Sequence, residues 1–455
     1  MAGDHKGKAP PQQPGIYALA TPAGRSAVAV LRLSGLGVKA AVEALVGHLP
    51  APRRAVLADL SDRPGDGTIG EVVDRGLCLW FPAPHSYTGE DVAEFHLHGG
   101  RATVAAMTEM LGRRGLRAAA PGEFTRRAFH NGKMDLTQAE AIADLVDAET
   151  SGQRRQALRQ MEGGLGAQFE GWRQRLIAAM ALTEAVLDFA DEELPAGVEE
   201  RVARELLLLR SDISSFLGIQ GRGERLREGV RVAILGPPNA GKSSLLNVLA
   251  QRDAAIVSTV AGTTRDVIEV HLDLGGVPAI LADTAGLRRA ADALEAEGVR
   301  RATAWAGGAD LKILVGAVGD WTALYTPEVR SVVSPGIIVV GNKSDLGPVP
   351  PVWDGLPVLP VSVRSGEGLE ALIERLTDAV GRLAGESEAP QLTRARHREG
   401  LFDCIGAIDR ALEGGEAELR AEELRFAAQA LGRLTGRIDV EDVLDALFRT
   451  FCIGK

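Results

Sequence analysis

The segment with the most informative chemistry is the glycine-rich turn Gly236-Pro-Pro-Asn-Ala-Gly-Lys-Ser-Ser244, which lies between the apolar runs 232–235 and 245–250. A strand, the pattern G-x-x-x-x-G-K-[ST] and a helix in this order are typical of a phosphate-binding loop. The backbone N–H groups of such a turn and the positive end of the next helix converge on one anion. The sequence therefore predicts that Lys242 reaches the β- and γ-phosphates of a nucleotide and that Ser243 holds Mg²⁺.

Two further loops follow in the order of a guanine-nucleotide switch domain. In the segment 261–266, Thr264 is expected to bind Mg²⁺ and the γ-phosphate. Asp283 follows the apolar run 279–282 and is expected to hold Mg²⁺ through water, while the N–H of Gly286 meets the γ-phosphate. Loss of the γ-phosphate would release both loops, so this pair would sense hydrolysis.

A fourth segment, Asn342-Lys-Ser-Asp345, follows an expected strand at 336–340 and is predicted to read the base. A carboxylate at Asp345 can accept from N1–H and the exocyclic amine of guanine together, and adenine offers neither donor, so the predicted nucleotide is GTP. A weaker fifth segment, 362–364, is expected to line the base. The predicted GTP-contacting residues are Asn239, Ala240, Gly241, Lys242, Ser243, Ser244, Ser258, Thr259, Val260, Ala261, Gly262, Thr263, Thr264, Asp283, Thr284, Ala285, Gly286, Asn342, Lys343, Asp345, Ser362, Val363 and Arg364.

The machinery for hydrolysis differs from that of Ras-like switches, which orient the attacking water with a glutamine after the D-x-x-G segment and use an arginine finger. The residue at that position is Leu287. Asn239 supplies an extra side-chain oxygen close to the phosphates, and this oxygen can help to coordinate a monovalent cation where the finger would lie. The alternative is that Asn239 only fixes the loop through a backbone hydrogen bond.

Length and composition set the limits of the fold. The 455 residues allow about three domains, and 45% hydrophobic residues provide a core for each. The formal net charge of −10 argues against non-specific coating of nucleic acid but permits a local basic patch. Three scattered cysteines without a C-x-x-C pair fit a reducing compartment. No apolar run approaches the ~20 residues of a membrane span, so we expect a soluble, cytoplasmic protein.

The predicted fold is multidomain, α/β plus α. After a disordered tail at 1–15, we expect an N-terminal α/β domain at 16–133, the first part of a helical domain at 134–228, a Ras-like P-loop GTPase domain at 229–385 and the second helical part at 386–455. A capping box at Thr137-Gln-Ala-Glu140 is expected to begin the helical part. The helical domain would thus be interrupted by the GTPase domain, which is tolerated because the two ends of a compact domain often lie close together.

Three polar features outside the GTPase domain have alternative interpretations. Glu94, His96 and His98 share one strand face, where a ligand-facing or interface surface is favoured over a metal site that lacks a third ligand. Cys452 is either a reactive thiol, if Lys455 lies close, or an incidental terminal residue. Arginine clusters are either phosphate contacts for nucleic acid or solvated faces. These arginines are Arg113, Arg114, Arg117, Arg126, Arg127, Arg394, Arg396 and Arg398.

Beyond the GTPase motifs, the chain resembles the tRNA uridine modification GTPases of the MnmE (TrmE) family. The resemblance is carried by Thr88-Gly-Glu-Asp91, Pro121-Gly-Glu-Phe124, the segment 133–140, the inserted GTPase domain and the tail Cys452-Ile-Gly-Lys455. It implies a homodimer that forms a heterotetramer with an FAD-dependent partner (MnmG, or GidA), with the FAD in the partner. The two proteins together place an aminomethyl-type group, commonly carboxymethylaminomethyl, on C5 of the wobble uridine (position 34) of certain tRNAs.

The same resemblance assigns further residues. A tetrahydrofolate derivative (5-formyl- or 5,10-methylene-) would supply the one-carbon unit and would bind the N-terminal dimerisation domain through Arg32, Glu94, Lys133 and Lys455. The resemblance also implies activation by K⁺, held by Asn239, Ser258, Val260 and Thr263, where Ser258 keeps the hydroxyl of a common threonine. The catalytic set it implies is Lys242, Glu295, which orients water through a second water, and Cys452.

Two other functions compete with tRNA modification. One is a ribosome-assembly or signalling switch that hydrolyses GTP and modifies nothing, and the other is a folate-dependent methyltransferase that works without a partner. Glu295 has its own alternative as a solvent-facing helix charge, since Glu297 lies two positions on. The tail and the folate-type residues favour the modification function, because a switch needs neither.

Overall fold

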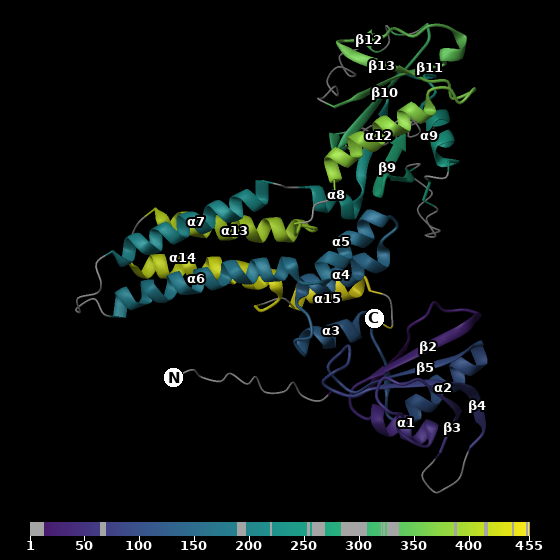
Figure 1. Ribbon diagram of the computed structural model, residues 1–455, viewed down its shortest axis with the longest axis vertical. Helices are drawn as coiled ribbons and strands as arrows, with labels where there is room; N and C mark the ends of the chain where they lie inside the picture. The colour runs from purple at the N-terminus through teal and green to yellow at the C-terminus, as the bar shows by residue number, and fades with distance from the viewer. Residues whose placement is uncertain are drawn as a thin grey trace, which may run out of the picture. The chain divides into compact units, whose positions relative to one another are not determined.

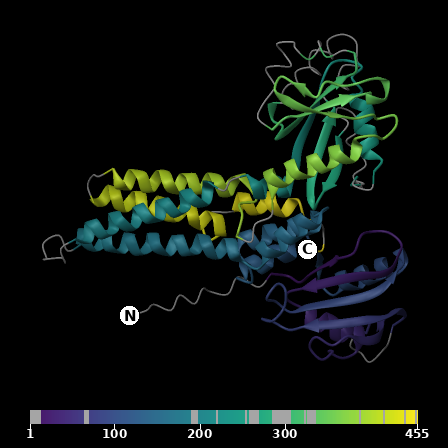
Figure 2. The same ribbon diagram turned by 45° about the horizontal axis from the view of Figure 1, so that its top comes forward.

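The computed structural model describes residues 13–63, 70–188, 197–218, 221–252, 255–256, 269–283, 307–319, 321, 324, 336–385, 389–413, 417–438, 441–451 and 454. The chain forms two compact units (Figures 1 and 2). The first unit combines residues 1–143 with residues 432–455, and the second comprises residues 144–431. Within the described residues, no helix is long and apolar enough to cross a membrane.

The first unit is built on a six-stranded sheet with the order β3-β4-β5-β2-β1-β6. Only the short pair β1–β6 is parallel; the other neighbouring strands are antiparallel. Leu31, Phe95 and Trp80 point to one face, where they pack against Leu45 and Met107 of the helices α1 and α2. The strands are β1 (Ile16–Leu19), β2 (Ser26–Ser34), β3 (Val56–Ser61), β4 (Val72–Phe81), β5 (Val92–Gly99) and β6 (Arg117–Ala118), and the helices are α1 (Val38–Val46) and α2 (Arg101–Arg113).

The end of the chain completes this first unit. Helix α15 (Glu441–Arg449) packs beside α3 (Glu123–His130) and the start of α4 (Leu136–Asp147). Phe448 is 3% exposed and belongs to an apolar cluster with Leu136. Arg126 on α3 donates to Glu441 and Asp445 at 2.8 and 3.0 Å. A segment more than 300 positions away in sequence therefore belongs to the N-terminal unit.

The start of α4 corrects one detail of the sequence analysis. The expected capping box at Thr137-Gln-Ala-Glu140 is displaced by two residues, because Asp135 caps the helix instead. The Asp135 carboxylate accepts from the Gln138 N–H at 2.9 Å, and the Gln138 side chain accepts from the Asp135 N–H at 3.0 Å. The Thr137 hydroxyl donates to the same carboxylate at 2.7 Å.

The second unit contains a helical part in which two segments of sequence pack together. Trp172 on α6 meets Phe216 on α7, and Phe169 on α6 meets His397 on α13. The teal helices α6 and α7 lie beside the yellow-green helices α13 and α14 in both ribbon views (Figures 1 and 2). The helices of this part are α5 (Ser151–Met161), α6 (Gly164–Asp188), α7 (Val198–Gly218), α8 (Arg222–Glu228), α13 (Ala395–Leu412) and α14 (Ala417–Thr435).

An α/β domain lies between α8 and α13 in the sequence. Its sheet has the order β12-β13-β11-β10-β7-β9-β8, with β13, β11, β10, β7 and β9 parallel. Val232, Ile234 and Leu281 of this sheet pack against Leu245 and Leu372 of α9 and α12. The elements are β7 (Val230–Leu235), α9 (Lys242–Ala250), β8 (Glu269–Leu274), β9 (Val277–Asp283), β10 (Leu311–Ala317), β11 (Ile338–Asn342), β12 (Val352–Trp353), β13 (Leu356–Pro360) and α12 (Leu369–Ala384). The predicted fold class is confirmed.

Packing of the chain end on the first unit leads to a direct test. Phe448→Ala should lower the free energy of unfolding of the first unit by about 3–5 kcal/mol, because removal of a buried aromatic side chain leaves a cavity behind. The matched control is Phe402→Ala, since Phe402 on α13 is 53% exposed and its removal should change stability by no more than about 0.5 kcal/mol. Hydrogen exchange of the α3 and α15 amides measures the effect. Equal protection of α15 in both variants would contradict the role given to Phe448.

Candidate GTP-binding site

The phosphate loop turns between the end of β7 and the start of α9 at Lys242. Gly241 adopts φ +93°, and a Cβ at this position would lie 2.1 Å from Nδ2 of Asn342. Gly236 also has no room for a Cβ, which would lie 2.2 Å from the carbonyl oxygen of Val315 on β10. The loop is therefore pressed against the carboxyl ends of β10 and β11, and both glycines are required by these contacts.

Lys242 and Ser243 begin α9, at the positive end of the helix dipole. Lys242 is 5% exposed, and its ammonium group donates to the carbonyl of Pro237 at 2.7 Å across the loop. The Ser243 hydroxyl donates to the carboxylate of Asp283. Asp283 is 2% exposed at the end of β9, directly opposite Ile234 of β7. The fold thus brings two of the three residues expected at Mg²⁺ into contact, and their hydroxyl and carboxylate oxygens are the ligand type that Mg²⁺ prefers.

The predicted base-reading segments meet at the end of β11. Asn342 is 3% exposed and its amide donates to the carbonyl of Ala240 in the phosphate loop at 2.8 Å. The amide oxygen of the same side chain accepts from the Val363 N–H at 3.4 Å. Asp345 accepts from the hydroxyl of Ser362 at 2.7 Å. One buried asparagine therefore joins the phosphate loop to both base segments.

A cavity of about 310 Å³ lies between these segments. One side of it is the start of α9, and the other side is the pair of base loops. The Asp345 carboxylate lines it and keeps acceptor capacity beyond the bond from Ser362. Its lining residues are Gly241, Ser244, Asn342, Lys343, Asp345, Leu346, Val363 and Arg364. The cavity is lined by the carboxylate of Asp345 and the amide of Asn342, which are polar groups of the kind that bind a nucleotide base.

Several predicted residues lie outside the described part of the chain. For hydrolysis these include Glu295, for the modification they include Cys452, and for the folate site they include Lys455. Asn239 is described and exposed, with φ +63° in the phosphate loop. The nucleotide residues outside the described part are Ser258, Thr259, Val260, Ala261, Gly262, Thr263, Thr264, Thr284, Ala285 and Gly286.

The first unit brings together part of the predicted folate set. Arg32 on β2 and Glu94 on β5 are paired in register, and their side chains form an ion pair at 2.9 Å. The Arg32 guanidinium lies 5.7 Å from the ring centroid of Tyr87 and donates to the carbonyl of Gly454 in the tail at 3.4 Å. Gly454 near the end of the chain therefore contacts the Arg32–Glu94 ion pair. Lys133 instead donates to the carbonyl of Pro84 at 3.0 Å.

The two histidines beside Glu94 have different partners. Nε2 of His96 lies 3.5 Å from Glu94, whereas the ring of His98 pairs with Asp74 at 2.7 Å. Burial raises the pKa of Asp74, but hydrogen bonds from the side chain and backbone of His98 outweigh it and lower that pKa overall. Among the described residues, no group of three or more His, Cys, Asp or Glu side chains is arranged to hold a metal ion.

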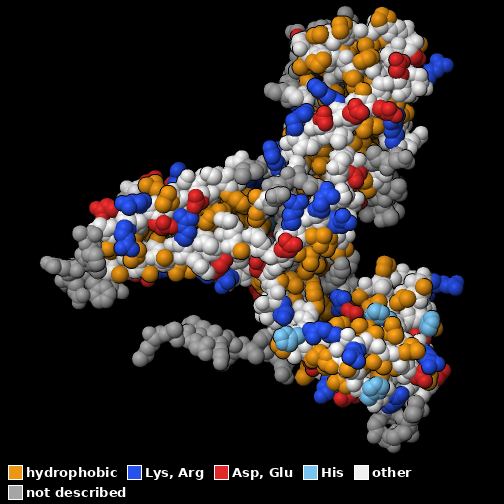
Figure 3. Space-filling view, in the orientation of Figure 1, with side chains coloured by type: hydrophobic (Ala, Val, Ile, Leu, Met, Phe, Trp, Pro, Cys, Tyr) orange, Lys and Arg blue, Asp and Glu red, His pale blue; other side chains and the backbone are white. Residues whose placement is uncertain are grey.

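Most of the arginines considered as phosphate contacts are engaged by carboxylates. Arg113 and Arg114 pair with Asp62, and Arg398 pairs with Glu224. On the face drawn in Figure 3, acidic side chains in red are interspersed among the blue lysines and arginines. The further pairs are Arg117 with Glu123, Arg126 with Glu441 and Asp445, Arg127 with Glu90 and Glu123, and Arg394 with Asp144.

Sequence reasoning missed the buried carboxylate that organises α3. Glu123 is 8% exposed and accepts from Arg117, Arg127 and the Ala120 N–H. Burial raises the pKa of Glu123, but the hydrogen bond from Arg117 and the other donors outweigh it and lower that pKa overall. The available signal was an acidic residue in the first turn of a helix that carries arginine at i+4.

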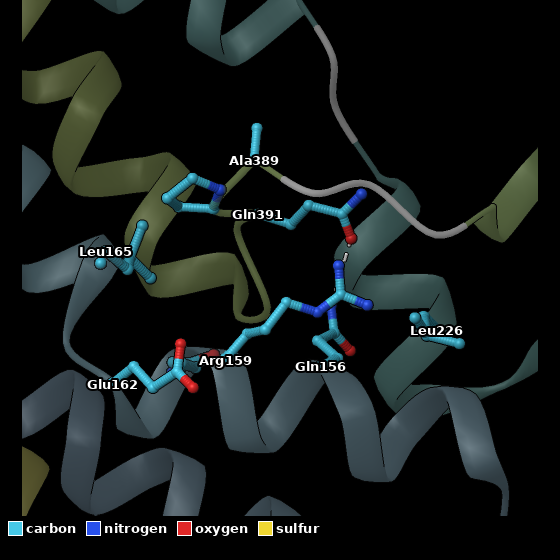
Figure 4. A pocket seen from close by; sticks show the side chains of 10 residues that line it. Gln156, Arg159, Glu162, Leu165, Leu226, Ala389 and Gln391 are labelled. Carbon is cyan, nitrogen blue, oxygen red and sulfur yellow. Dashed lines mark hydrogen bonds between the residues drawn. The ribbon is translucent and has the colours of Figure 1, made fainter.

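A second cavity, of about 320 Å³, was also not predicted from the sequence. It lies between α5, α8 and the outgoing connection of the inserted domain, defined here as residues 389–394. Figure 4 shows Gln156 and Arg159 of α5 reaching toward Gln391, with Leu165 and Leu226 on opposite sides. The Gln156 amide donates to the carbonyl of Gly223 at 3.2 Å and to the Gln391 side chain at 3.4 Å.

Solved structures of GTP-binding proteins are similar to part of the chain. The G domain of the FeoB iron transporter of T. maritima is 27% identical, covers 33% of this chain and 98% of its own, and has a TM-score of 0.25. An Era variant of Aquifex aeolicus in complex with GDP and AlF4⁻ is 24% identical, covers 41% of this chain and 68% of its own, and has a TM-score of 0.27.

Family models and full-length relatives cover nearly the whole chain. Residues 15–133 match the GTP-binding protein TrmE N-terminus, and residues 136–452 match the MnmE helical domain. The tRNA modification GTPase MnmE of Paramagnetospirillum magneticum is 55% identical over 445 residues, which cover 97% of this chain and 99% of that protein. The protein of the same name from Rhodospirillum rubrum is 51% identical, again over 97% of this chain and 99% of that protein. The chain therefore belongs to the MnmE family of tRNA modification GTPases.

Proposed function

We propose that the chain is a GTP hydrolase that acts in tRNA modification and works on the wobble uridine at position 34 of certain tRNAs. With an FAD-dependent partner of the MnmG (GidA) type, it adds a (carboxymethyl)aminomethyl group to C5 of that uridine. The observation that carries the proposal is the contact of Asn342 with Ala240 and Val363, which joins a phosphate loop to a guanine-reading pocket. Membership in the MnmE family supports the tRNA part of the proposal.

Three described residues of the proposed GTP site have defined tasks. Lys242 exchanges its bond to Pro237 for the β- and γ-phosphates, so the loop and the ligand compete for one buried ammonium group. Asp345 accepts from N1–H and the exocyclic amine of guanine, while Ser362 fixes the orientation of its carboxylate. Charge-assisted hydrogen bonds of this kind are the strong ones in a site. Selectivity for GTP follows, because adenine leaves the Asp345 carboxylate without donors.

Two cations complete the proposed site. Ser243 and Thr264, with Asp283 acting through a water, would hold Mg²⁺, and the ion would supply positive charge against the developing negative charge of the phosphates. Asn239 lies exposed in the loop and offers an oxygen to K⁺, together with Ser258, Val260 and Thr263. Glu295 orients the attacking water through a second water. These roles account for hydrolysis with Leu287 in the position where Ras-like switches have glutamine.

The proposed one-carbon chemistry belongs to the first unit. Arg32, Glu94, Lys133 and Lys455 bind a tetrahydrofolate derivative, and Cys452 is needed for the modification. Arg32 suits the glutamate tail of a folate, and the Glu94 carboxylate suits the donors of its pterin ring. Support for the site comes from the Arg32–Glu94 pair and from the contact of Gly454 with Arg32. The protein acts as a cytoplasmic homodimer, and the partner carries the FAD.

The proposed function is tested by mass spectrometry of nucleosides from total tRNA. We expect an aminomethyl-type wobble uridine to disappear in cells without the protein and to return when the gene is restored. Unchanged uridines in cells without the protein would overturn the proposal and would favour a GTPase switch with no modification activity.

Base recognition has its own test in Asp345→Asn. GTP affinity should fall about 100-fold or more, because two hydrogen bonds to a charged group contribute about 1.5–3 kcal/mol each. Xanthosine triphosphate is the matched ligand: it carries a carbonyl where guanine has its amine, so the amide that the substitution introduces can donate to it and affinity should rise. Titration of the wild type and the variant with both nucleotides measures this change in base specificity. Unchanged GTP affinity would show that Asp345 does not read the base.

The cation assignment is tested with Asn239→Gly. Glycine adopts the φ of +63° without strain and removes the whole side chain, including the oxygen proposed to bind K⁺. Turnover of GTP by the wild type should fall when K⁺ is replaced by Na⁺, and the variant should lose this dependence. Cation-independent turnover of the wild type would reject the assignment. A variant with undiminished K⁺ dependence would restrict Asn239 to fixing the loop.

A further inference from the structure

The β8–β9 hairpin joins the two loops that are proposed to sense the γ-phosphate. β8 begins at Glu269, shortly after the position of Thr264 in the sequence, and β9 ends at Asp283. The strands pair without interruption from Glu269 opposite Ala282 to Leu274 opposite Val277. This antiparallel ladder therefore connects both loops to the turn of the hairpin at Gly275 and Gly276.

The turn of the hairpin rests on the N-terminus of α5. The Gly152 N–H donates to the carbonyl of Gly276 at 3.0 Å. A Cβ on Gly152 would lie only 2.3 Å from that carbonyl oxygen, so the two backbones are in direct contact. Beside this contact, Nδ1 of His271 on β8 lies 3.8 Å from the carboxylate of Glu149. The helical part and the hairpin therefore meet through backbone atoms, which cannot adjust by changing a rotamer.

The first turn of α5 is itself rigidly held. Thr150 and Gln153 form a capping box in which each side chain satisfies the backbone of the other. The Gln153 amide also donates to the carbonyl of Arg227 at 2.9 Å, at the end of α8. α8 leads into β7, and the phosphate loop follows β7. One helical turn thus contacts both the hairpin between the sensing loops and the segment that leads to the phosphate loop.

We propose that the first turn of α5, residues 150–153, positions the β8–β9 hairpin and couples the nucleotide state of the GTPase domain to the helical part. This inference rests on the proposed function of the two loops as γ-phosphate sensors. Gly152 and Gly276 are positioning residues, since they act through the hairpin and line no part of the guanine cavity. The coupling runs through the Gly152–Gly276 hydrogen bond and the capping box behind it.

The cavity beside α5 gives this coupling room to operate. It borders the same helix at Gln156 and Arg159 and separates it from Pro390 of the outgoing connection. Packed interiors resist displacement because they contain few voids. The cavity of about 320 Å³ beside α8 and the outgoing connection is open to solvent, so no packed core fills the space between these segments and α5.

The test compares Gly152→Ala with Gly171→Ala in the full-length protein. Gly171 is an exposed glycine of α6 where a Cβ would meet nothing within 4 Å, so both variants add a methyl group to a helix and only one disrupts the contact. Hydrogen exchange is measured with GDP and with a non-hydrolysable GTP analogue. In the wild type and in Gly171→Ala, peptides spanning 149–161 should exchange at rates that differ at least about fivefold between the nucleotides, the lower end of coupling between sites.

In Gly152→Ala this difference between nucleotides should vanish, while the affinity for both nucleotides stays unchanged. A purely structural role would alter exchange equally in both nucleotide states and would preserve the ratio. The coupling is overturned if the wild type shows no nucleotide dependence in these peptides, or if Gly152→Ala keeps the ratio of the wild type.

A second variant protects the test against misfolding of the first. Thr150→Val keeps the shape of the side chain and removes the acceptor of the capping box, so the first turn of α5 should fray and the ratio should again fall. An unchanged ratio in Thr150→Val contradicts the proposal. The measurement needs neither tRNA nor a partner. Absence of a modified uridine in cells would therefore reject the proposed function without affecting the outcome for α5.

Discussion

The two connections of the inserted domain must lie side by side, and the rest of the second unit depends on this constraint. The side chain of Gln156 on α5 holds the two connections together, because it donates to Gly223 in α8 and to Gln391 in the outgoing connection. The backbones are close enough that a Cβ on Gly223 would lie 2.4 Å from the carbonyl of Leu392. An ion pair between Arg398 of α13 and Glu224 of α8 adds a further link at 2.6 Å, directly after the outgoing connection. Because both ends are fixed on α5, the helical bundle can form across a long insertion.

The parallel strands of the inserted domain explain why one site can be assembled from distant segments. β7, β9 and β11 point in the same direction, so the residues that follow them gather at one edge of the sheet. Lys242, Asp283 and Asn342 all lie at this edge. The buried Asn342 side chain then fixes the distance between the phosphate loop and the base loop through its hydrogen bond to Ala240. A lost bond here would leave a buried amide without a partner, which costs about 1–3 kcal/mol.

Features that depend only on the residues of one short segment could be predicted from the sequence. The phosphate loop and the Asn342–Asp345 segment were recognisable because each combines a fixed spacing with an apolar strand before it. The start of α4 was misplaced because capping patterns begin at both Asp135 and Thr137, and only three-dimensional packing selects between them. Burial of Glu123 and its several hydrogen bonds were not predicted, because its partner Arg117 belongs to another element.

Contacts across long separations set the limit of such reasoning. Gln156 and Gln391 are 235 positions apart, and no local pattern links one glutamine to the other. The same holds for Arg32 and Gly454, which are separated by 422 positions. Both contacts exist only because the chain returns to elements that it left much earlier.

The distribution of charge constrains how a protein of this kind can bind tRNA. Arg113, Arg114 and Arg398 already contact carboxylates, and the formal net charge is −10. A phosphate can take over such an arginine only by displacing its acidic partner, so much of the electrostatic gain is offset. Each phosphate that is truly neutralised steepens the salt dependence of binding by about 0.7–0.9 in the logarithmic slope. Binding through few neutralised phosphates is therefore weakly salt-dependent.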